Sequence, residues 1–482
     1  MYIGIDLGTS GLRALLVDGQ GAPVSSATSE YDVSHPKPGW SEQDPNHWTT
    51  ALDAALSALR SDNPSAFGRV AGISFSGHMH GAVTLDHIGS VLRPCILWND
   101  TRSHVEAAQM DSAPGAREIS GNIVFPGFTA PKLMWMAHHE PDLFEQIATV
   151  MLPKDYLTFW LTGRRVSDMS DAAGSAWLDV TQRGWSGDLL AASGMRADQM
   201  PELLEGTDFA AKITPSRASE LGLPADVRVI AGGADNAVAA CGVGALSEGQ
   251  AFVSLGTSGV LLSGRDRCAP APASAVHTFC HAVPGRWYQM GVTLAATDSL
   301  NWLSKVTGQT PEALSSAAGH IQAPSDLRFY PYLSGERTPH NDSTIRGGFS
   351  GIDIAHGAGD LARAVMEGVA FNLRDSLEAM RSTGLQIETA LAIGGGTRSQ
   401  LWTEMLATAL DLPLERPVQG DFGAALGAAR LAICGVTGAA PQDIMQPPPV
   451  ADVIEPNPSL RGAYEDAYAA FHAGYPKLKA LQ

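Results

Sequence analysis

Lysine is scarce in this sequence. Its 482 residues include only seven lysines, and 32 Lys and Arg residues stand against 50 Asp and Glu residues, which gives a formal net charge of −18. No lysine follows a glycine, which excludes the Gly-Lys-Ser/Thr phosphate loop of many nucleotide-binding proteins. The acidic balance also argues against a nucleic-acid partner, because a phosphate backbone is bound by clustered Lys and Arg. If the protein handles phosphate groups, it must do so with little lysine and against a repulsive overall charge.

Cysteine and long apolar runs are also scarce. The five cysteines are odd in number, widely spaced and contain no Cys-x-x-Cys pair, which excludes a disulfide framework and an obvious zinc knuckle and suits a reducing compartment. No run approaches the ~18 apolar residues that cross a bilayer, and the N-terminal segment resembles a strand rather than a signal peptide. We therefore expect a soluble, cytoplasmic protein with no membrane partner.

The composition is that of a globular protein, and the sequence contains an internal repeat. Hydrophobic residues make up 44% and charged residues 17%, which is typical of a folded chain, and the length predicts two to four domains. Leu-Gly-Thr-Ser at residues 7–10 recurs at residues 255–258 between two β-prone runs, so each copy is predicted to form the turn of a hairpin. The repeat indicates two similarly built halves, at residues 1–244 and 245–440, followed by a tether and a packed helix at residues 441–482.

The order of the predicted elements restricts the fold class. Three meandering strands precede a helix that should begin after Asp44, with Pro45 at its first position. That start differs from the βαβ unit of a dinucleotide-binding fold and argues against a dehydrogenase. Later elements complete an α/β pattern: a strand at residues 70–75, a long helix at 361–382, a strand at 390–393 and a small-residue helix from Phe422 to Ile433.

Two glycine-rich turns can bind phosphate without lysine. Residues 8–11 and 256–259 both read Gly-Thr-Ser-Gly, and such a turn presents backbone N–H groups and hydroxyls to a single point. Two of these turns facing each other across a cleft would hold the β- and γ-phosphates of a nucleotide from both sides. A plain tight hairpin is the alternative for either turn taken alone.

Two aspartates stand at strand ends near these features. Asp6 precedes the first turn, and Asp235 follows an apolar run and two glycines. Phosphoryl transfer needs Mg²⁺ to neutralise charge and a carboxylate to receive the acceptor's hydroxyl proton. One carboxylate by the phosphates and another by the acceptor would divide these tasks. The alternative is that either aspartate only caps a turn.

Three further segments carry polar chemistry. The three glycines after Ile393 allow close backbone approach to a flat ligand such as adenine. His78 and His80 flank a methionine and suit hydrogen bonding to a polar ligand, although a metal pair or a core histidine is an alternative. Residues 98–102, Trp-Asn-Asp-Thr-Arg, combine an aromatic surface with both signs of charge, which suits a polyol. A surface turn with an ordinary ion pair is the alternative for that segment.

Together these motifs resemble the FGGY carbohydrate kinase family. The resemblance covers nearly the whole chain except its tail, and the motifs occur in the family's order at residues 5–11, 94–100, 127–133, 232–236, 254–259, 332–339, 347–367, 393–396 and 422–433. Within the family, residues 77–81, 38–44 and 152–156 are most similar to bacterial xylulokinases. Two positions depart from the pattern, because Arg13 stands where relatives often have Lys and His78 stands where Gln is usual.

The resemblance implies a fold, a reaction and roles for particular residues. The fold would be α/β, with two ribonuclease-H-like domains of the actin and heat-shock chaperone superfamily around a central catalytic cleft. The reaction would be ATP-dependent phosphorylation of D-xylulose with Mg²⁺. The alternatives are another sugar or polyol kinase of the family, such as a ribulokinase, a glycerol kinase or a rare pentulose kinase, and a sugar-independent ATPase of the actin fold. A homodimer is also compatible with the resemblance.

The implied site residues fall into three groups. Asp235 would be the base, and Asp6 would help to place the phosphates, with both carboxylates near Mg²⁺ directly or through water. The predicted sugar-binding residues are Met79, His80, Trp98, Asp100, Arg102 and Asn236. The predicted nucleotide- and phosphate-binding residues are Gly8, Thr9, Ser10, Arg13, Gly256, Thr257, Ser258, Gly394, Gly395, Gly396 and Arg398.

Overall fold

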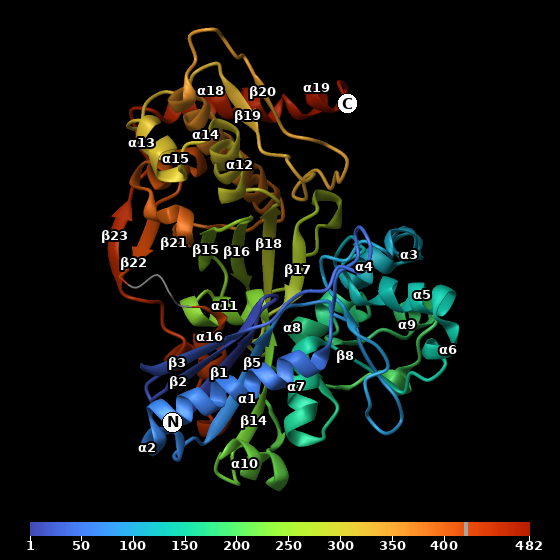
Figure 1. Cartoon of the computed structure of the whole chain (residues 1–482). Helices are drawn as coiled ribbons and strands as arrows, with labels where there is room; N and C mark the ends of the chain where they lie inside the picture. Colours follow the sequence, from blue (N-terminus) through green and yellow to red (C-terminus); the bar gives the residue numbers. More distant parts are fainter. Residues whose placement is uncertain (419–422) are drawn as a thin grey trace.

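The computed structural model describes residues 1–418 and 423–482. They form two α/β halves, each built on a mixed sheet, and Figure 1 shows the second half above the first. The strand order in the first sheet is β13-β14-β5-β1-β2-β3. These strands are β1 (Tyr2–Leu7), β2 (Gly11–Val17), β3 (Pro23–Glu30), β5 (Gly72–Gly77), β13 (Phe209–Lys212) and β14 (Arg228–Ala234).

The second sheet repeats the plan of the first. Its order is β17-β18-β16-β15-β21-β22-β23, formed by β15 (Ala251–Leu255), β16 (Gly259–Arg265), β17 (His277–Cys280), β18 (Trp287–Thr293), β21 (Ala390–Ile393), β22 (Leu414–Pro417) and β23 (Val450–Ile454). In both sheets an antiparallel hairpin, β1–β2 or β15–β16, lies beside parallel strands. The two Gly-Thr-Ser-Gly segments form the hairpin turns, so the predicted duplication of the hairpin is confirmed.

Helices cover both faces of the first sheet. The predicted helix after Asp44 is α1 (Pro45–Asp62), in which the Asp44 side chain accepts a 2.9 Å hydrogen bond from the amide of Asn46. Helix α1 packs on β2 and β3, whereas α16 (Ala424–Thr437) packs on β1 and β5 beside α11 (Asp235–Val243) (Figure 1). The contact between α16 and β1 is close, because a Cβ on Gly4 would collide with the carbonyl of Ala425.

Helix α16 therefore comes from the second half of the sequence but packs on the sheet of the first half. Its predicted first residue, Phe422, lies outside the described residues, and the helix begins at Ala424. Small residues along α16 permit this crossing, since a Cβ on Gly427 would collide with the carbonyl of Val238 in α11. The pattern of small residues predicted the helix but not the half on which it packs.

The second sheet carries the remaining long helices. The predicted helix at residues 361–382 is α14 (Ala358–Arg381), which packs on α15 (Gln400–Leu410) and on β18. The C-terminal helix α18 (Arg461–His472) buries Tyr464, Ala467 and Phe471, so the packing of the predicted last helix is confirmed. The segment predicted as a tether differs, because β23 lies within it and pairs with β22 at the edge of the sheet. None of the helices in the described ranges combines the length and the apolar character that crossing a membrane requires.

A lobe of the first half, between β7 (Cys95–Ile96) and β13, packs against the β17–β18 hairpin of the second half. Their shared hydrophobic core includes Phe128 and Trp177 from the lobe and Phe279 and Tyr288 from the hairpin. Asn122 ties the two parts, because its amide accepts a 3.0 Å hydrogen bond from the Thr278 N–H and donates one of 2.8 Å to the Thr278 carbonyl. The second half therefore contributes directly to the surroundings of the cleft.

Candidate active site

The first glycine-rich turn has its carbonyl groups occupied by the protein. The carbonyl of Gly8 accepts a 2.7 Å hydrogen bond from the Tyr31 hydroxyl, and that of Thr9 accepts one of 2.6 Å from the Gln43 amide. The backbone N–H groups of Thr9 and Ser10 have no acceptor among the described residues. A turn with bound carbonyls and open amides presents positive dipoles, which is the arrangement that phosphate oxygens require.

The second turn is built in the same way. The Gly256 carbonyl accepts hydrogen bonds from the N–H and the hydroxyl of Thr297, at 2.9 and 2.8 Å, and the Thr257 carbonyl accepts one of 2.8 Å from the Ala296 N–H. Thr297 begins helix α12 (Thr297–Thr307), so that helix fixes the turn from behind. Both copies of the repeated motif thus direct their carbonyls inward, which supports the phosphate-binding interpretation of Gly8 to Ser10 and of Gly256 to Ser258.

Glycines of the second half border a cavity next to this turn. Gly394 adopts a φ of 91°, and a Cβ there would meet the Leu255 carbonyl carbon at 2.9 Å. Gly396 packs on the side chain of Leu255, whereas a Cβ on Gly395 would meet nothing. Gly394, Gly395 and Arg398 line a cavity of about 560 Å³, a size that suits a small-molecule ligand. Three of the predicted nucleotide residues therefore line one cavity next to Leu255, whereas Ser10 and Arg13 line a different groove in the first half.

Asp6 lies at the end of β1, in the middle of the first sheet. Its pairing partners are Arg13 on β2 and Ser76 on β5. Burial raises the pKa of Asp6, while the neighbouring Ser76 hydroxyl and the charge of Arg13 act in the opposite direction. Asp6 and Arg13 also line a groove of about 610 Å³ that continues along the first turn to Ser10.

Asp235 is the first residue of α11 and follows a distorted end of β14. The pairing of β14 with β5 shifts register between Ile230 and Gly233, and Gly232 takes a φ of 78° that L residues rarely adopt. Burial raises the pKa of Asp235 to about 6, hydrogen bonds from the Asn236 N–H at 2.6 Å and the Asn236 side chain at 2.9 Å lower it, and the charge of Asp6 raises it. The two predicted carboxylates therefore lie close enough to influence each other.

A buried ionic cluster supports the strand that leads to Asp235. The Lys154 ammonium lies 2.5 Å from Asp155 and 2.8 Å from Asp168, and Asp168 accepts a 2.5 Å hydrogen bond from the Ser170 hydroxyl. Ser170 in turn accepts a 3.0 Å hydrogen bond from the N–H of Ala234, the residue before Asp235. This chain of contacts fixes the backbone just before Asp235. The single charge of Lys154 offsets only part of the carboxylate charge in this cluster, which also includes Asp171 at 3.9 Å.

The predicted sugar residues Met79 and His80 follow β5. His80 has a φ of 72°, stacks on Phe128 with ring centroids 4.6 Å apart, and contacts the Gly174 carbonyl at 2.6 Å through Nδ1. Burial lowers the pKa of His80 to about 3, so the ring is neutral. Since a carbonyl can only accept, Nδ1 carries the proton and Nε2 is left as an acceptor for a ligand hydroxyl. The buried Met79 contacts the Tyr288 hydroxyl at 4.0 Å.

Asp100 and Arg102 bind each other. Asp100 is buried, and it accepts hydrogen bonds from the Ser41 N–H at 2.6 Å and from two nitrogens of Arg102 at 2.9 and 2.7 Å. The Arg102 guanidinium lies 3.6 Å from the centre of the Trp40 ring and forms a second ion pair with Glu42. This geometry gives both residues a role in holding residues 97–102, and their direct contact with a sugar stays a prediction.

Other predicted residues lie at the junction between the sugar and phosphate segments. The Trp98 indole donates a 3.0 Å hydrogen bond to the Thr9 hydroxyl and so links the two. The Asn236 side chain donates a hydrogen bond to the carboxylate of Asp235 and lies beside it on α11.

His78, in contrast, is buried in the core, where its ring lies edge-on to that of Trp48. Burial lowers the pKa of His78 to about 3. It is therefore a neutral core histidine.

Three residues near the sugar segment were not predicted from the sequence. Lys132 is buried and donates 2.7 Å hydrogen bonds to the carbonyls of His80 and Gly127. His277 and Arg337 come from the second half and approach the aromatic wall around His80. Lys132 and Arg337 lie within the family motifs at residues 127–133 and 332–339. However, no pattern in the sequence near either residue shows that these distant segments meet.

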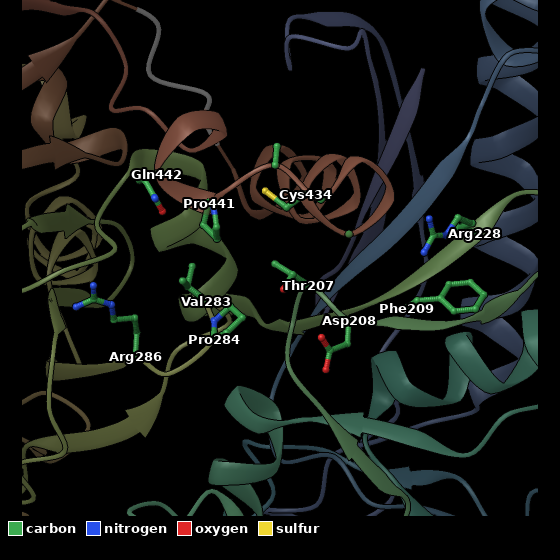
Figure 2. A pocket seen from close by; sticks show the side chains of 13 residues that line it. Thr207, Asp208, Phe209, Arg228, Val283, Pro284, Arg286, Cys434, Pro441 and Gln442 are labelled. Carbon is green, nitrogen blue, oxygen red and sulfur yellow. The ribbon is translucent and has the colours of Figure 1, made fainter.

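A further cavity of about 500 Å³ lies between the halves, away from the predicted residues. It is lined by Thr207 and Arg228 of the first half and by Pro284, Arg286 and Cys434 of the second, among others (Figure 2). None of the predicted site residues lines it. The two glycine-rich turns, the two carboxylates and the His80 segment therefore lie outside this cavity.

The comparisons with known proteins agree with this geometry. The model of the FGGY family of carbohydrate kinases matches residues 1–242 with its N-terminal domain and residues 251–436 with its C-terminal domain. The chain is 44% identical over 485 residues to a xylulose kinase of Klebsiella pneumoniae, with all of both chains covered. It is 46% identical over 435 residues to a xylulose kinase of Escherichia coli, with 90% of this chain and 89% of the relative covered.

Solved structures extend the comparison to three dimensions. The crystal structure of a "xyloylose kinase" from Brucella ovis superimposes with a TM-score of 0.98, at 53% sequence identity and with all of both chains covered. A likeness of this extent includes both sheets and the crossing of α16.

Proposed function

The chain belongs to the FGGY family of carbohydrate kinases, and from this premise we propose that its sugar substrate is D-xylulose, which it converts with ATP to D-xylulose 5-phosphate and ADP. The observation that most strongly supports this proposal is the sequence identity of 44% to a xylulose kinase over all of both chains. Local geometry supports it, because Tyr288, whose hydroxyl contacts Met79 next to the neutral His80, is also influenced by the charge of the base candidate Asp235. Full-length similarity is informative about substrate, since the sugar contacts come from segments spread over the chain.

In the proposed reaction, Asp235 accepts the proton of the C5 hydroxyl while that oxygen forms its bond to the γ-phosphorus. The bond between the γ-phosphorus and the β–γ bridging oxygen breaks, and ADP leaves with that oxygen. A carboxylate is a weak base for an alcohol, but the proton departs late, when the oxygen is already bonding to phosphorus. The raised pKa of Asp235, about 6, brings it nearer to the operating pH of a general base.

We propose that the nucleotide is held by the two turns and by the cavity at Gly394, Gly395 and Arg398. The open N–H groups of both turns suit the phosphates, and the glycine-lined cavity suits the base and ribose. Asp6 and Asp235 offer the carboxylate oxygens that Mg²⁺ prefers, so these two residues would hold the ion directly or through water. When bound, Mg²⁺ would neutralise phosphate charge. A homodimer and a cytoplasmic location stay predictions.

The substrate proposal is tested by a panel of acceptors. ADP formation by the purified protein should rise strongly with D-xylulose and little with glycerol or L-ribulose, and the product should carry its phosphate on C5 by NMR. A reaction without acceptor is the control, because an ATPase of the actin fold would release ADP without sugar. Preference for glycerol or L-ribulose would contradict the substrate and leave the family membership intact.

A further inference from the structure

Arg337 has an unpaired guanidinium. It lies in the segment between β19 (Arg328–Tyr330) and β20 (Gly348–Ser350), and in the part of the chain that the structure describes its side chain forms neither a hydrogen bond nor an ion pair. Its only close partner there is the ring of Phe125, whose centre is 4.5 Å from the guanidinium carbon. A half-buried guanidinium carries five donors that a folded protein normally satisfies, so these donors are available to a ligand.

The backbone of Arg337 is held firmly in place. The Glu336 carboxylate accepts hydrogen bonds from the N–H of Arg337 at 2.6 Å and the N–H of Leu294 at 3.1 Å. On the other side, the Thr338 hydroxyl donates a 2.9 Å hydrogen bond to the Ala275 carbonyl. Glu336 is therefore engaged by backbone groups and leaves the neighbouring guanidinium free. This fixed backbone is typical of a residue that must present its side chain at one position.

The guanidinium lies on the same side of the site as His80. Phe125, which it covers, is 5.7 Å from Phe128, and Phe128 stacks on His80. Phe125 is also 5.5 Å from His277. The positive charge of Arg337 contributes to the lowered pKa values of both histidines. These contacts place Arg337 on the wall formed by His80 and His277.

This wall combines two complementary groups. The neutral His80 offers Nε2 as an acceptor, because its Nδ1–H donates a hydrogen bond to the Gly174 carbonyl. Arg337, in contrast, offers only donors. An open-chain 2-ketose has the matching pattern, since its carbonyl oxygen can only accept and the neighbouring hydroxyls can donate. With the C5 hydroxyl at Asp235, the C1–C2 end of a five-carbon ketose lies away from the base.

We propose that Arg337 donates a hydrogen bond to the C2 carbonyl oxygen of the keto sugar and thereby sets a preference for a ketose over a polyol. The proposal rests on the proposed function, because it places the phosphorylated end of the sugar at Asp235. It assigns to the second half a direct part in sugar recognition. The Arg337 segment contacts the lobe of the first half that carries Phe125 and Phe128.

The test compares D-xylulose with xylitol, which has the same carbon chain without the carbonyl group. In Arg337→Met, kcat/KM for D-xylulose should fall by about 10- to 100-fold, the range for a hydrogen bond to a charged group, whereas the KM for ATP should stay within about twofold. The dissociation constant of xylitol, measured by calorimetry, should change by less than about threefold. The exposed Arg267 of the same half provides a matched control, and Arg267→Met should behave as the wild type.

Two outcomes would overturn the proposal. One is a kcat/KM for D-xylulose in Arg337→Met within about threefold of the wild-type value, and the other is equal weakening of D-xylulose and xylitol binding. Arg337→Lys, which keeps the charge but loses the planar donors, should retain part of the preference and serves if the methionine variant does not fold. Absence of D-xylulose turnover in the wild type would contradict the proposed function instead. In that case the dissociation constants of the two sugars, measured without ATP, still decide the role of Arg337.

Discussion

Protonation of Asp235 should switch off phosphoryl transfer in mildly acidic solution. Burial is the main cause that raises the pKa of this carboxyl to about 6, and the nearby charge of Asp6 adds to it. Two hydrogen bonds from Asn236 lower the pKa and keep the carboxylate from being protonated at neutral pH. As the proposed base, Asp235 is active only when deprotonated, so activity should be lost as the pH falls through this pKa.

The size of the effect follows from the titration of a single carboxyl. At one unit below a pKa of about 6, roughly one site in ten is deprotonated, so kcat/KM for the sugar should fall about tenfold between pH 7 and pH 5. The parameter that reports the pKa values of the free enzyme is kcat/KM. The relevant measurement is therefore the initial rate of ADP formation with both D-xylulose and ATP subsaturating, from pH 5 to pH 8.

A variant of Asn236 identifies the titrating group. Asn236→Ala removes the 2.9 Å hydrogen bond from the side chain while the backbone N–H remains, so the charged form of Asp235 is less stable and the inflection should move to higher pH. The exposed Asn46, which lies on α1, gives the matched control Asn46→Ala, whose profile should follow the wild type. A flat profile from pH 5 to pH 7, or an inflection that Asn236→Ala leaves in place, would refute the assignment of the base.

Three further substitutions test other parts of the site. Asp235→Ala should lower kcat by about 10²- to 10⁴-fold, the usual contribution of a general base, with the dissociation constant for ATP nearly unchanged by calorimetry; wild-type turnover would contradict the role of Asp235. Lys154→Met leaves the buried carboxylates of Asp155 and Asp168 without their cation. The free energy of unfolding, measured with denaturant, should therefore fall by about 3–5 kcal/mol. An unchanged unfolding midpoint would show that the ionic cluster is not needed for stability. Gly174→Ala places a Cβ 2.7 Å from the His80 ring. It should lower kcat/KM for the sugar by about 10- to 100-fold, with little effect on the KM for ATP. Equal losses of kcat/KM for the sugar and for ATP would contradict a local effect.

Local patterns in the sequence were sufficient for elements whose contacts are close along the chain. The two hairpin turns and the cap at Asp44 are each formed within a few residues, and the structure contains them where they were predicted. Longer-range packing was not accessible in this way. The crossing of α16 to the first sheet depends on the fit of Gly4 and Gly427 to residues far away in sequence, and β23 depends on an open edge of β22.

The same distinction applies to the site. Asp6 and the glycine-rich turns are visible because each carries its chemistry in one contiguous motif. Asp100 and Arg102 were predicted from a similar motif, but the structure shows that they bind each other, which depends on the half-buried Trp40 and the buried Glu42. Arg337 could not be identified as a part of the sugar wall, because its position relative to His80 is set only when the second half packs on the lobe of the first.

The scarcity of lysine has a physical explanation in this arrangement. Of the seven lysines, Lys132 is occupied by two carbonyl groups and Lys154 by carboxylates, both in the interior. Neither is free to meet a phosphate, and no lysine lines the groove at Asp6 or the cavity at Gly394. The positive groups that line these places are Arg13, Arg398 and Arg416, and the two turns add their open amides. Amides carry no net charge that must be desolvated when a nucleotide binds, so such turns can bind phosphates in a protein of net charge −18.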